Sequence, residues 1–186
     1  SVGDPVTHTL SVSSVGATDV VITSSTGHGG TTDYTKTINE GTSVALTAPI
    51  LLGKNFTGWT GAVNSANQEI TLMMTAAKSV AANYVTTYTL SVSSVGATAV
   101  SMGSTRGEGD STDHRKTVIL DTSVNLQAPQ YVDSGADRKR FTSWTGVVLS
   151  PSVSVASPLT ADKSVSCTHV AEPVAHKMSA SCVGAN

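Results

Sequence analysis

The chain has 186 residues, a formal net charge of −2 and only 13% charged residues, so no basic excess points to nucleic acid or an anionic membrane. Its longest apolar runs are a few residues, far below the roughly 20 that a membrane-spanning helix needs, and no signal peptide is visible. Ser, Thr and Val are abundant, which favours strands and, with two late cysteines, a secreted or surface-displayed protein.

The sequence contains two copies of one unit. THTLSVSSVGATDV (7–20) returns 80 residues later as TYTLSVSSVGATAV (87–100). The offset becomes 85 at Phe56 and Phe141, because the second copy has extra residues in QYVDSGADRKR (130–140). Such a repeat indicates tandem modules of one fold. We predict an N-terminal segment (1–7), a first module (8–86), a second, divergent module (87–170) and a C-terminal tail (171–186).

Apolar and polar residues alternate over short runs in each copy, beginning in the first copy with Leu10 and Val12. A period of two is typical of half-buried strands, and Gly- and Asn-containing segments between the runs indicate turns. We therefore expect an all-β fold with two tandem small antiparallel β domains, or a β-rich, β-grasp-like variant. Each copy should have six or seven short strands, mostly antiparallel, with little helix.

The segment NEG (39–41) predicts a hairpin between DYTKTI (33–38) and SVALTA (43–48). Gly41 can take a positive φ angle there at no steric cost. The second copy has Asp121 in the same place, so we expect its turn to differ in shape.

Four phrases follow one another in fixed order in the first copy: TLSV, GTSVALTA, FTGWTG and KSVAANY. With them, residues 8–85 resemble the divergent InlB B-repeat family, whose members are tandem β or β-grasp-like modules of secreted and surface-anchored bacterial proteins. Residues 88–170 resemble it more loosely, because Asp121 and Ser143 replace glycines of the pattern. The resemblance implies no catalytic residue and makes the aromatic phrase a fold signature. In this chain that signature is carried by Phe56, Gly58, Gly61, Phe141 and Gly146.

The chain's two tryptophans, Trp59 and Trp144, both lie in this phrase. In a regular strand a residue three positions after Phe56 faces the opposite side. Either Trp59 points outward, or a bulge near Gly58 brings both rings inside. We favour a core position and keep open an exposed platform for a sugar or partner protein. Ser143, in place of this glycine, argues against a bulge that strictly needs a positive φ.

The two cysteines predict an extracellular disulfide between Cys167 and Cys182, which would close a loop of about 15 residues. It would hold the tail against the second module as a cap. Cys167 replaces Ala82 of the first copy and has the parity of inward-facing residues. With His169 and His176 the cysteines could instead bind zinc, but their spacing matches no standard zinc motif.

The loops at 26–34 and 106–114 are equivalent in the two copies and rich in glycine. Glu108, Asp110 and Asp113 in the second loop could bind Ca²⁺ weakly. A solvated loop is the simpler interpretation of both segments.

The inserted stretch DSGADRKR (133–140) is the most highly charged part of the chain and predicts a solvated loop tip. Loop tips often carry recognition. Tyr131, Arg138 and Arg140 are therefore the candidate residues for a contact that only the second copy makes.

The sequence gives little support for catalysis, since no G-x-S-x-G, H-E-x-x-H or P-loop phrase occurs. We predict no enzyme, no cofactor and no metal. The leading hypothesis is an extracellular, non-enzymatic structural or adhesive repeat protein of a bacterial surface or secreted assembly, acting as stalk, spacer or self-assembling filament subunit. The alternative is a carbohydrate-binding module pair accessory to a secreted enzyme. Expected partners are neighbouring subunits or repeat modules and, as a further option, surface polysaccharide, without nucleic acid or a membrane span.

Overall fold

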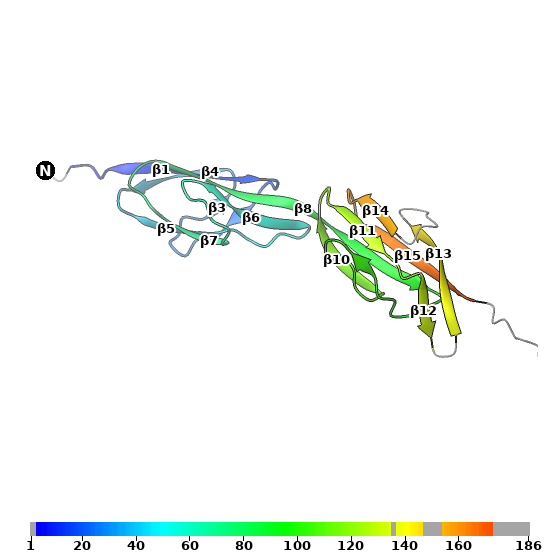
Figure 1. Ribbon diagram of the computed structural model, residues 1–186. Helices are drawn as coiled ribbons and strands as arrows, with labels where there is room; N and C mark the ends of the chain where they lie inside the picture. Colours follow the sequence, from blue (N-terminus) through cyan, green and yellow to red (C-terminus); the bar gives the residue numbers. More distant parts are fainter. Residues whose placement is uncertain (1–2, 135–136, 147–153, 173–186) are drawn as a thin grey trace, which may run out of the picture. The chain divides into compact units, whose positions relative to one another are not determined.

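The computed structural model describes residues 3–134, 137–146 and 154–172, and within these ranges all regular structure is β (Figure 1). The all-β prediction is confirmed. No helix occurs in the described ranges, and hence none that is long and apolar enough to cross a membrane. The chain forms two compact units, one from residues up to 88 with 117–122, the other from 89–116 and 123 onward. Each is described by itself.

The strands of the first unit are β1 (Thr7–Val15), β2 (Val21–Ile22), β3 (Gly30–Thr31), β4 (Tyr34–Asn39), β5 (Ser43–Thr47), β6 (Lys54–Gly61), β7 (Glu69–Met73) and the first part of β8 (Lys78–Val95). The remaining strands are the second part of β8, β9 (Gly103–Ser104), β10 (His114–Ile119), β11 (Ser123–Gln127), β12 (Tyr131–Ser134), β13 (Asp137–Gly146), β14 (Ser154–Pro158) and β15 (Lys163–Ala171). Strand β8 thus closes the first module and opens the second.

The main sheet of the first module has β1 and β8 at its centre. Strand β1 pairs antiparallel with β4 and parallel with β8, and β8 pairs antiparallel with β6. Strand β5 pairs with β7 separately, and a bridge from Thr23 to Thr47 links it to the short β2–β3 pair. The expected β4–β5 hairpin is wrong, because residues 39–41 connect strands that pair with different partners. An alternating pattern predicts a strand, but it does not predict which other strand it pairs with.

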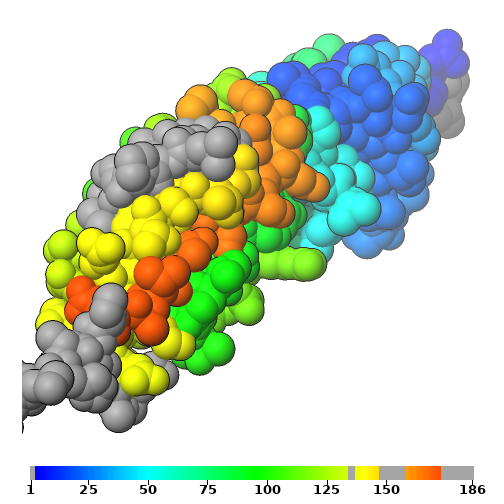
Figure 2. Space-filling model, turned by 90° about the vertical axis from the view of Figure 1, so that its right-hand side faces the viewer, coloured from blue at the N-terminus to red at the C-terminus, as the bar shows by residue number. Residues whose placement is uncertain are grey.

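The second module repeats this arrangement. Strand β8 pairs parallel with β15, β15 pairs antiparallel with β13, and β11 pairs with β14 and β9. Strand β12 has no counterpart in the first module and pairs with β13. Figure 2 shows β13 in yellow, β15 in orange-red and β8 in green side by side on the surface of this module. The copies therefore share one fold.

The core of the first module contains side chains from the main sheet (β1, β4, β6 and β8) and from the separate β5–β7 pair. Buried residues alternate with more exposed ones in β7, in Leu10–Val12 of β1 and in each part of β8, as the alternation predicted, whereas β5 has three buried residues in a row. The largest fully buried side chains in the described parts of both modules include Trp59, Trp144, Leu10, Leu46, Leu90 and Leu126.

The turn between β4 and β5 keeps its shape in the second module, contrary to expectation. Gly41 has a φ of 77° and Asp121 one of 61°, and the N–H of Thr42 or Thr122 donates to the carbonyl of Asn39 or Ile119 in the respective turn. Aspartate is one of the few L-residues that tolerates the left-handed region. The turn geometry is thus retained at some backbone cost.

A glycine after the first strand of each module lies very close to the last strand. A Cβ on Gly16 would fall 1.9 Å from the carbonyl oxygen of Tyr84, and one on Gly96 would fall 2.0 Å from that of His169. Both glycines also have φ angles near the left-handed region, 78° and 81°. Only glycine fits this close approach of two backbones.

Candidate functional site

Both tryptophans are buried, with 1% of Trp59 and 0% of Trp144 exposed. The register of β6 against β8 shifts between Phe56 and Gly58, so a bulge brings Trp59 into the core. The indole N–H of Trp59 donates to the carbonyl of Gln68 at 2.9 Å. The rings therefore present no exposed platform, and the predicted role of Trp59 and Trp144 in binding a sugar or partner has no support.

The bulge survives the loss of its glycine. In β13 the register shifts between Phe141 and Ser143, although only Gly58, and not Ser143, has a positive φ. The extra residue is a threonine in both modules. The hydroxyl of Thr57 donates to the carbonyl of Asn83 at 3.2 Å, and that of Thr142 to the carbonyl of Thr168 at 3.1 Å. These side-chain bonds tie each bulge to its neighbouring strand.

The last glycine of the phrase also has a steric reason. A Cβ on Gly61 would lie 2.4 Å from the carbonyl oxygen of Ser79, and one on Gly146 would lie 2.2 Å from that of Ser164. Their φ angles are 107° and 109°. The residues singled out as a fold signature thus act on the backbone and the core, which is a structural role.

A third polar or aromatic side chain completes each aromatic cluster. The Tyr84 ring lies edge-on to the Phe56 ring, with 5.5 Å between the ring centres. Its hydroxyl donates a hydrogen bond to the carbonyl of Pro49 at 2.9 Å. In the second module His169 lies edge-on to Phe141 at 5.8 Å, and its Nε2 lies 2.9 Å from the carbonyl of Pro129. The bond to this carbonyl assigns the proton to Nε2. Nδ1 of the buried His169 then has no partner among the described residues.

Cys167 is fully buried opposite Trp144 and beside Ser94 of β8. Its inward parity is as predicted. It forms no disulfide within the described residues, and Cys182 and His176 lie outside them, so the predicted disulfide is not supported. Burial raises the pKa of the thiol to about 11. A core thiol of this kind is a poor nucleophile and behaves as a small apolar side chain.

The Gly-rich loops are organised by one hydroxyl network that occurs twice. In the first module the Ser14 hydroxyl donates to the carbonyl of Ala17 at 2.8 Å and lies 2.7 Å from the Thr32 hydroxyl oxygen, which accepts the N–H of Val20. The carboxylate of Asp33 accepts the N–H of Ser14 at 3.2 Å. The second module has the same four bonds, formed by Ser94, Ala97, Thr112, Val100 and Asp113.

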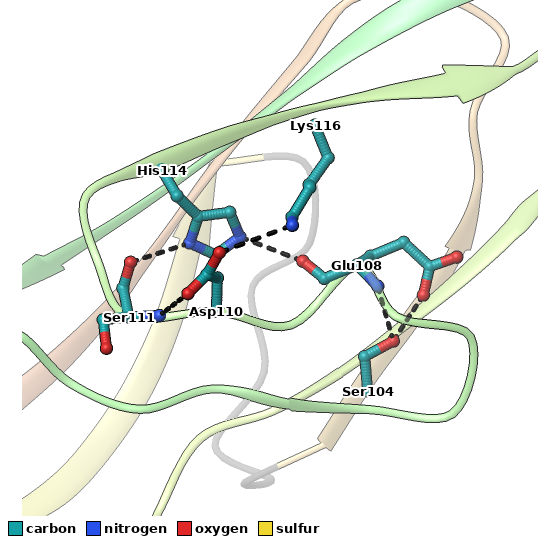
Figure 3. Close-up of polar contacts among 6 residues, drawn as sticks. All are labelled: Ser104, Glu108, Asp110, Ser111, His114 and Lys116. Atoms are coloured by element: carbon teal, nitrogen blue, oxygen red, sulfur yellow. Dashed lines mark hydrogen bonds and ion pairs between the residues drawn. The ribbon is translucent and has the colours of Figure 1, made fainter.

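The acidic residues of the second loop each bond to a different group, and Figure 3 shows Glu108 and Asp110 pointing to different partners. Glu108 is buried and accepts a hydrogen bond from the Ser104 hydroxyl, while Asp110 forms an ion pair with Lys116 at 3.4 Å. Asp113 belongs to the hydroxyl network. Because each carboxylate is held by a different protein group, the loop offers no Ca²⁺ cage. No group of three or more potential metal ligands occurs in the ranges that the structure describes.

His114 braces the same loop (Figure 3). Its Nε2 lies 2.9 Å from the carbonyl of Glu108, and its Nδ1 lies 3.1 Å from the carbonyl of Ser111. In the first module Tyr34 occupies the equivalent place and donates to the carbonyl of His28 at 3.0 Å. The loop is thus packed on its own module by side chains, and its polar groups serve its conformation.

The insertion forms a β-hairpin of β12 and β13, a pairing that the sequence did not indicate, and its charged residues Asp133, Asp137, Arg138 and Arg140 are exposed (Figure 1). Tyr131 pairs with Arg140, and Asp133 pairs with Arg138, so these four side chains share one face of the hairpin. The guanidinium carbon of Arg138 lies 3.8 Å from the centre of the Tyr131 ring. The three candidate residues Tyr131, Arg138 and Arg140 are therefore brought together, and 37% of Tyr131 is exposed.

Sequence reasoning missed an exposed apolar loop in the first module. Ile50 and Leu52 are 86% and 104% exposed, where the second module has the start of its hairpin. A groove of about 600 Å³ lies beside them. Its lining residues are Ser14, Gly16, Ala17, Thr18, Leu51, Leu52 and Lys54. The segment LGKN (52–55) indicated a turn here, but not that the side chains of Ile50 and Leu52 would be exposed.

Residues 20–87 match the model of the divergent InlB B-repeat domain family, and this match lies in the first module. The structure is similar to the major pilin protein T-13 from Streptococcus pyogenes serotype GAS131465, with 9% identity, 89% of this chain and 96% of that chain covered, and a TM-score of 0.21. It is also similar to a major pilin from Streptococcus pyogenes, with 12% identity, 91% and 98% coverage, and a TM-score of 0.21. A search of curated proteins gave no significant match. At these TM-scores the two pilins do not bear on function.

Proposed function

We propose that the chain is a pair of structural repeat modules of an extracellular bacterial protein, serving as a stalk or spacer. The observation that carries this proposal is the detailed repetition of one β module, with the same central parallel pairing, bulge and loop network in both copies. The chain passes from one module to the next within β8, without a separate linker. The match of residues 20–87 to a bacterial repeat family supports the same role.

The polar side chains of the described residues favour a structural role over an enzymatic one. The hydroxyls and carboxylates of the Gly-rich loops bond to their own backbone or to a neighbouring side chain. The two tryptophans that motivated a carbohydrate-binding module are buried. That alternative therefore loses its main residues.

A stalk is favoured over a self-assembling filament by the edge strands. Strand β4 ends the strand order of its sheet and carries Lys36, and the equivalent β10 carries Arg115 and Lys116. Charged side chains on edge strands hinder pairing with another chain. We propose that partners contact other surfaces, first among them the exposed face of Tyr131, Arg138 and Arg140 on the hairpin that only the second module has.

Two measurements test this proposal: where the protein is located in the cell, and whether the purified chain assembles. Antibodies against the chain should label intact cells of the source bacterium, and protease added outside should remove the label while a cytoplasmic marker stays intact. Sedimentation of the purified chain should give a monomer at every concentration. A chain found only in the cytoplasm would overturn the extracellular role, and concentration-dependent polymers would replace the stalk with the filament.

A further inference from the structure

We propose that each module is a mechanical clamp: tension applied along the chain shears the central parallel ladder between its first and last strands. This property goes beyond a spacer role, since a spacer needs only length. Its biological use rests on the proposed stalk function, but the property itself belongs to the fold.

The geometry of the first module places its two ends on adjacent strands. Residues Leu10–Val15 of β1 pair in parallel with Lys78–Asn83 of β8. Because the strands are parallel, the chain enters the ladder at one end and leaves it at the other. Tension from both sides therefore pulls β1 and β8 past each other along their axes. All the hydrogen bonds of the ladder then share the load, whereas peeling from one end would break them one at a time.

The ladder is also protected from its sides. Strand β4 flanks β1 and strand β6 flanks β8, so neither clamp strand is an edge. Below the ladder, Val12 of β1 and Val80 of β8 are opposite each other and buried. Sliding the strands would thus separate a packed core as well as the hydrogen bonds, which raises the barrier that governs forced unfolding.

The second module keeps this arrangement although its sequence has diverged. Residues Leu90–Val95 of β8 pair in parallel with Lys163–Thr168 of β15. Its ladder starts at the same repeat positions as the first, since Leu90 corresponds to Leu10 and Lys163 to Lys78. An added bond lies at its start, where the carboxylate of Asp162 accepts the N–H of Thr89 at 2.8 Å. The first module has Ala77 in place of Asp162.

The load path runs through β8 without leaving regular structure. In chain order it passes from β1 across the first ladder to β8, and from the second part of β8 across the second ladder to β15. Strand β12, which only the second module has, pairs with β13 and belongs to neither ladder. The chain can therefore vary in that segment without weakening the clamp.

Single-molecule pulling in two directions tests the proposal on the full chain. Handles are attached through introduced cysteines in a C167A/C182S background, where alanine is the residue that the first module has at this place. Asp4→Cys with Glu172→Cys pulls end to end. Asp4→Cys with Glu40→Cys instead peels β1 from β4, because Thr7 lies directly opposite Asn39. We expect the end-to-end unfolding force to be several times the peeling force.

A matched pair of core substitutions separates mechanical from thermodynamic stability. Val12→Ala lies on the clamp, and Val44→Ala lies on β5, outside the load path; both side chains are buried. Both variants should lower the melting temperature by similar amounts. Only Val12→Ala should lower the end-to-end force, and only in one of the two unfolding events.

Equal forces in the two directions would overturn the clamp, and so would equal force losses in the two valine variants. The direction test needs no core substitution, so a poorly folding variant does not decide the matter. These measurements use purified protein and do not depend on where the chain is located. A strong clamp in a cytoplasmic protein would thus overturn the stalk function alone, and a weak clamp on a surface protein would overturn only this inference.

Discussion

The two modules differ twice in the same way: a tyrosine of the first is a histidine in the second, and the hydrogen bond is kept. Tyr34 and His114 both reach the carbonyl at one loop position, and Tyr84 and His169 both reach the carbonyl of a proline. The fold thus selects a ring with a polar tip that reaches one carbonyl, and several residue types meet that requirement. The backbone contacts at Gly16 and Gly96 allow no such exchange.

The modules differ most outside the repeated framework. Where the first has the exposed apolar residues Ile50 and Leu52, the second extends β13 and adds β12. Strand β12 pairs only with β13, and so it does not contact the parallel ladder of β8 and β15 through backbone pairing. Variation is therefore tolerated where it adds to the sheet edge, which is also where copy-specific contacts are expected.

The largest expected effect tests whether the two glycine contacts are equally strict. Gly16→Ala and Gly96→Ala should each cost at least about 3 kcal/mol of unfolding free energy, because the new Cβ overlaps a backbone oxygen and the φ angle is left-handed. The measurement is a urea titration followed by hydrogen exchange and mass spectrometry, which reports on each module separately.

Gly27→Ala and Gly107→Ala are the matched controls for these substitutions. Their φ angles are 79° and 85°, but a Cβ there has no atom within 4 Å. Each should cost only about 1–2 kcal/mol, the strain of a left-handed L-residue. Equal losses at all four positions would show that backbone strain alone matters. A much smaller loss for Gly96→Ala than for Gly16→Ala would show that the second module is looser at this contact.

The next effect tests the exchange of tyrosine and histidine. Tyr84→His should destabilise the first module by about 2 kcal/mol, because a smaller ring leaves a gap and brings a buried nitrogen without a partner. Tyr84→Phe keeps the ring and loses one hydrogen bond, so about 1 kcal/mol is expected. The same urea titration measures both. A neutral Tyr84→His would mean that the first module already accommodates the side chain of the second.

The smallest expected effect is a loss of stability of the second module at alkaline pH, caused by Cys167, where the first module has Ala82. Burial raises the pKa of Cys167 from 9.0 to about 11, so the folded state holds this proton more tightly than the unfolded state. The stability of the second module should be unaffected below pH 9 and fall as the pH rises towards 11, by about 1 kcal/mol at pH 10. Urea titrations from pH 8 to 11 in reductant measure it.

Cys167→Ala should remove this loss and serves as its control. In the first module the groups with raised pKa are Tyr34 and Tyr84, also because of burial, so its stability should fall only above pH 10. An unchanged alkaline loss in Cys167→Ala would show that another group causes it.

Periodicity and repetition predicted the all-β fold, the repeated module and the inward parity of Cys167. The sequence raised the question of whether a bulge precedes each tryptophan but could not answer it. The hydrogen bonds of Thr57 and Thr142 to the next strand are visible only in the structure. The central parallel pairing was missed, because β1 and β8 are far apart in the chain and alternation carries no information about partners.

The candidate binding residues were predictable only in part. The charge of the insertion indicated a copy-specific feature, and the hairpin register brings Tyr131, Arg138 and Arg140 to one face. The tryptophans were ambiguous because a single inserted residue reverses which side of a strand a ring occupies. The segment LGKN (52–55) indicates a turn, but how far Leu52 is exposed depends on the loop around it.

Strand β8 has a consequence for how such an array is inherited. Its buried residues Val80, Ala82, Tyr84, Leu90 and Val92 keep one phase across the whole strand. The buried residues of the first core end at Tyr84, those of the second begin at Leu90, and no residue between them is buried. One strand thus supplies the last ladder strand of one module and the first ladder strand of the next. A gene duplication that lengthens the array must therefore copy a whole repeat from one opening strand to the next, as the 80-residue spacing of Leu10 and Leu90 shows.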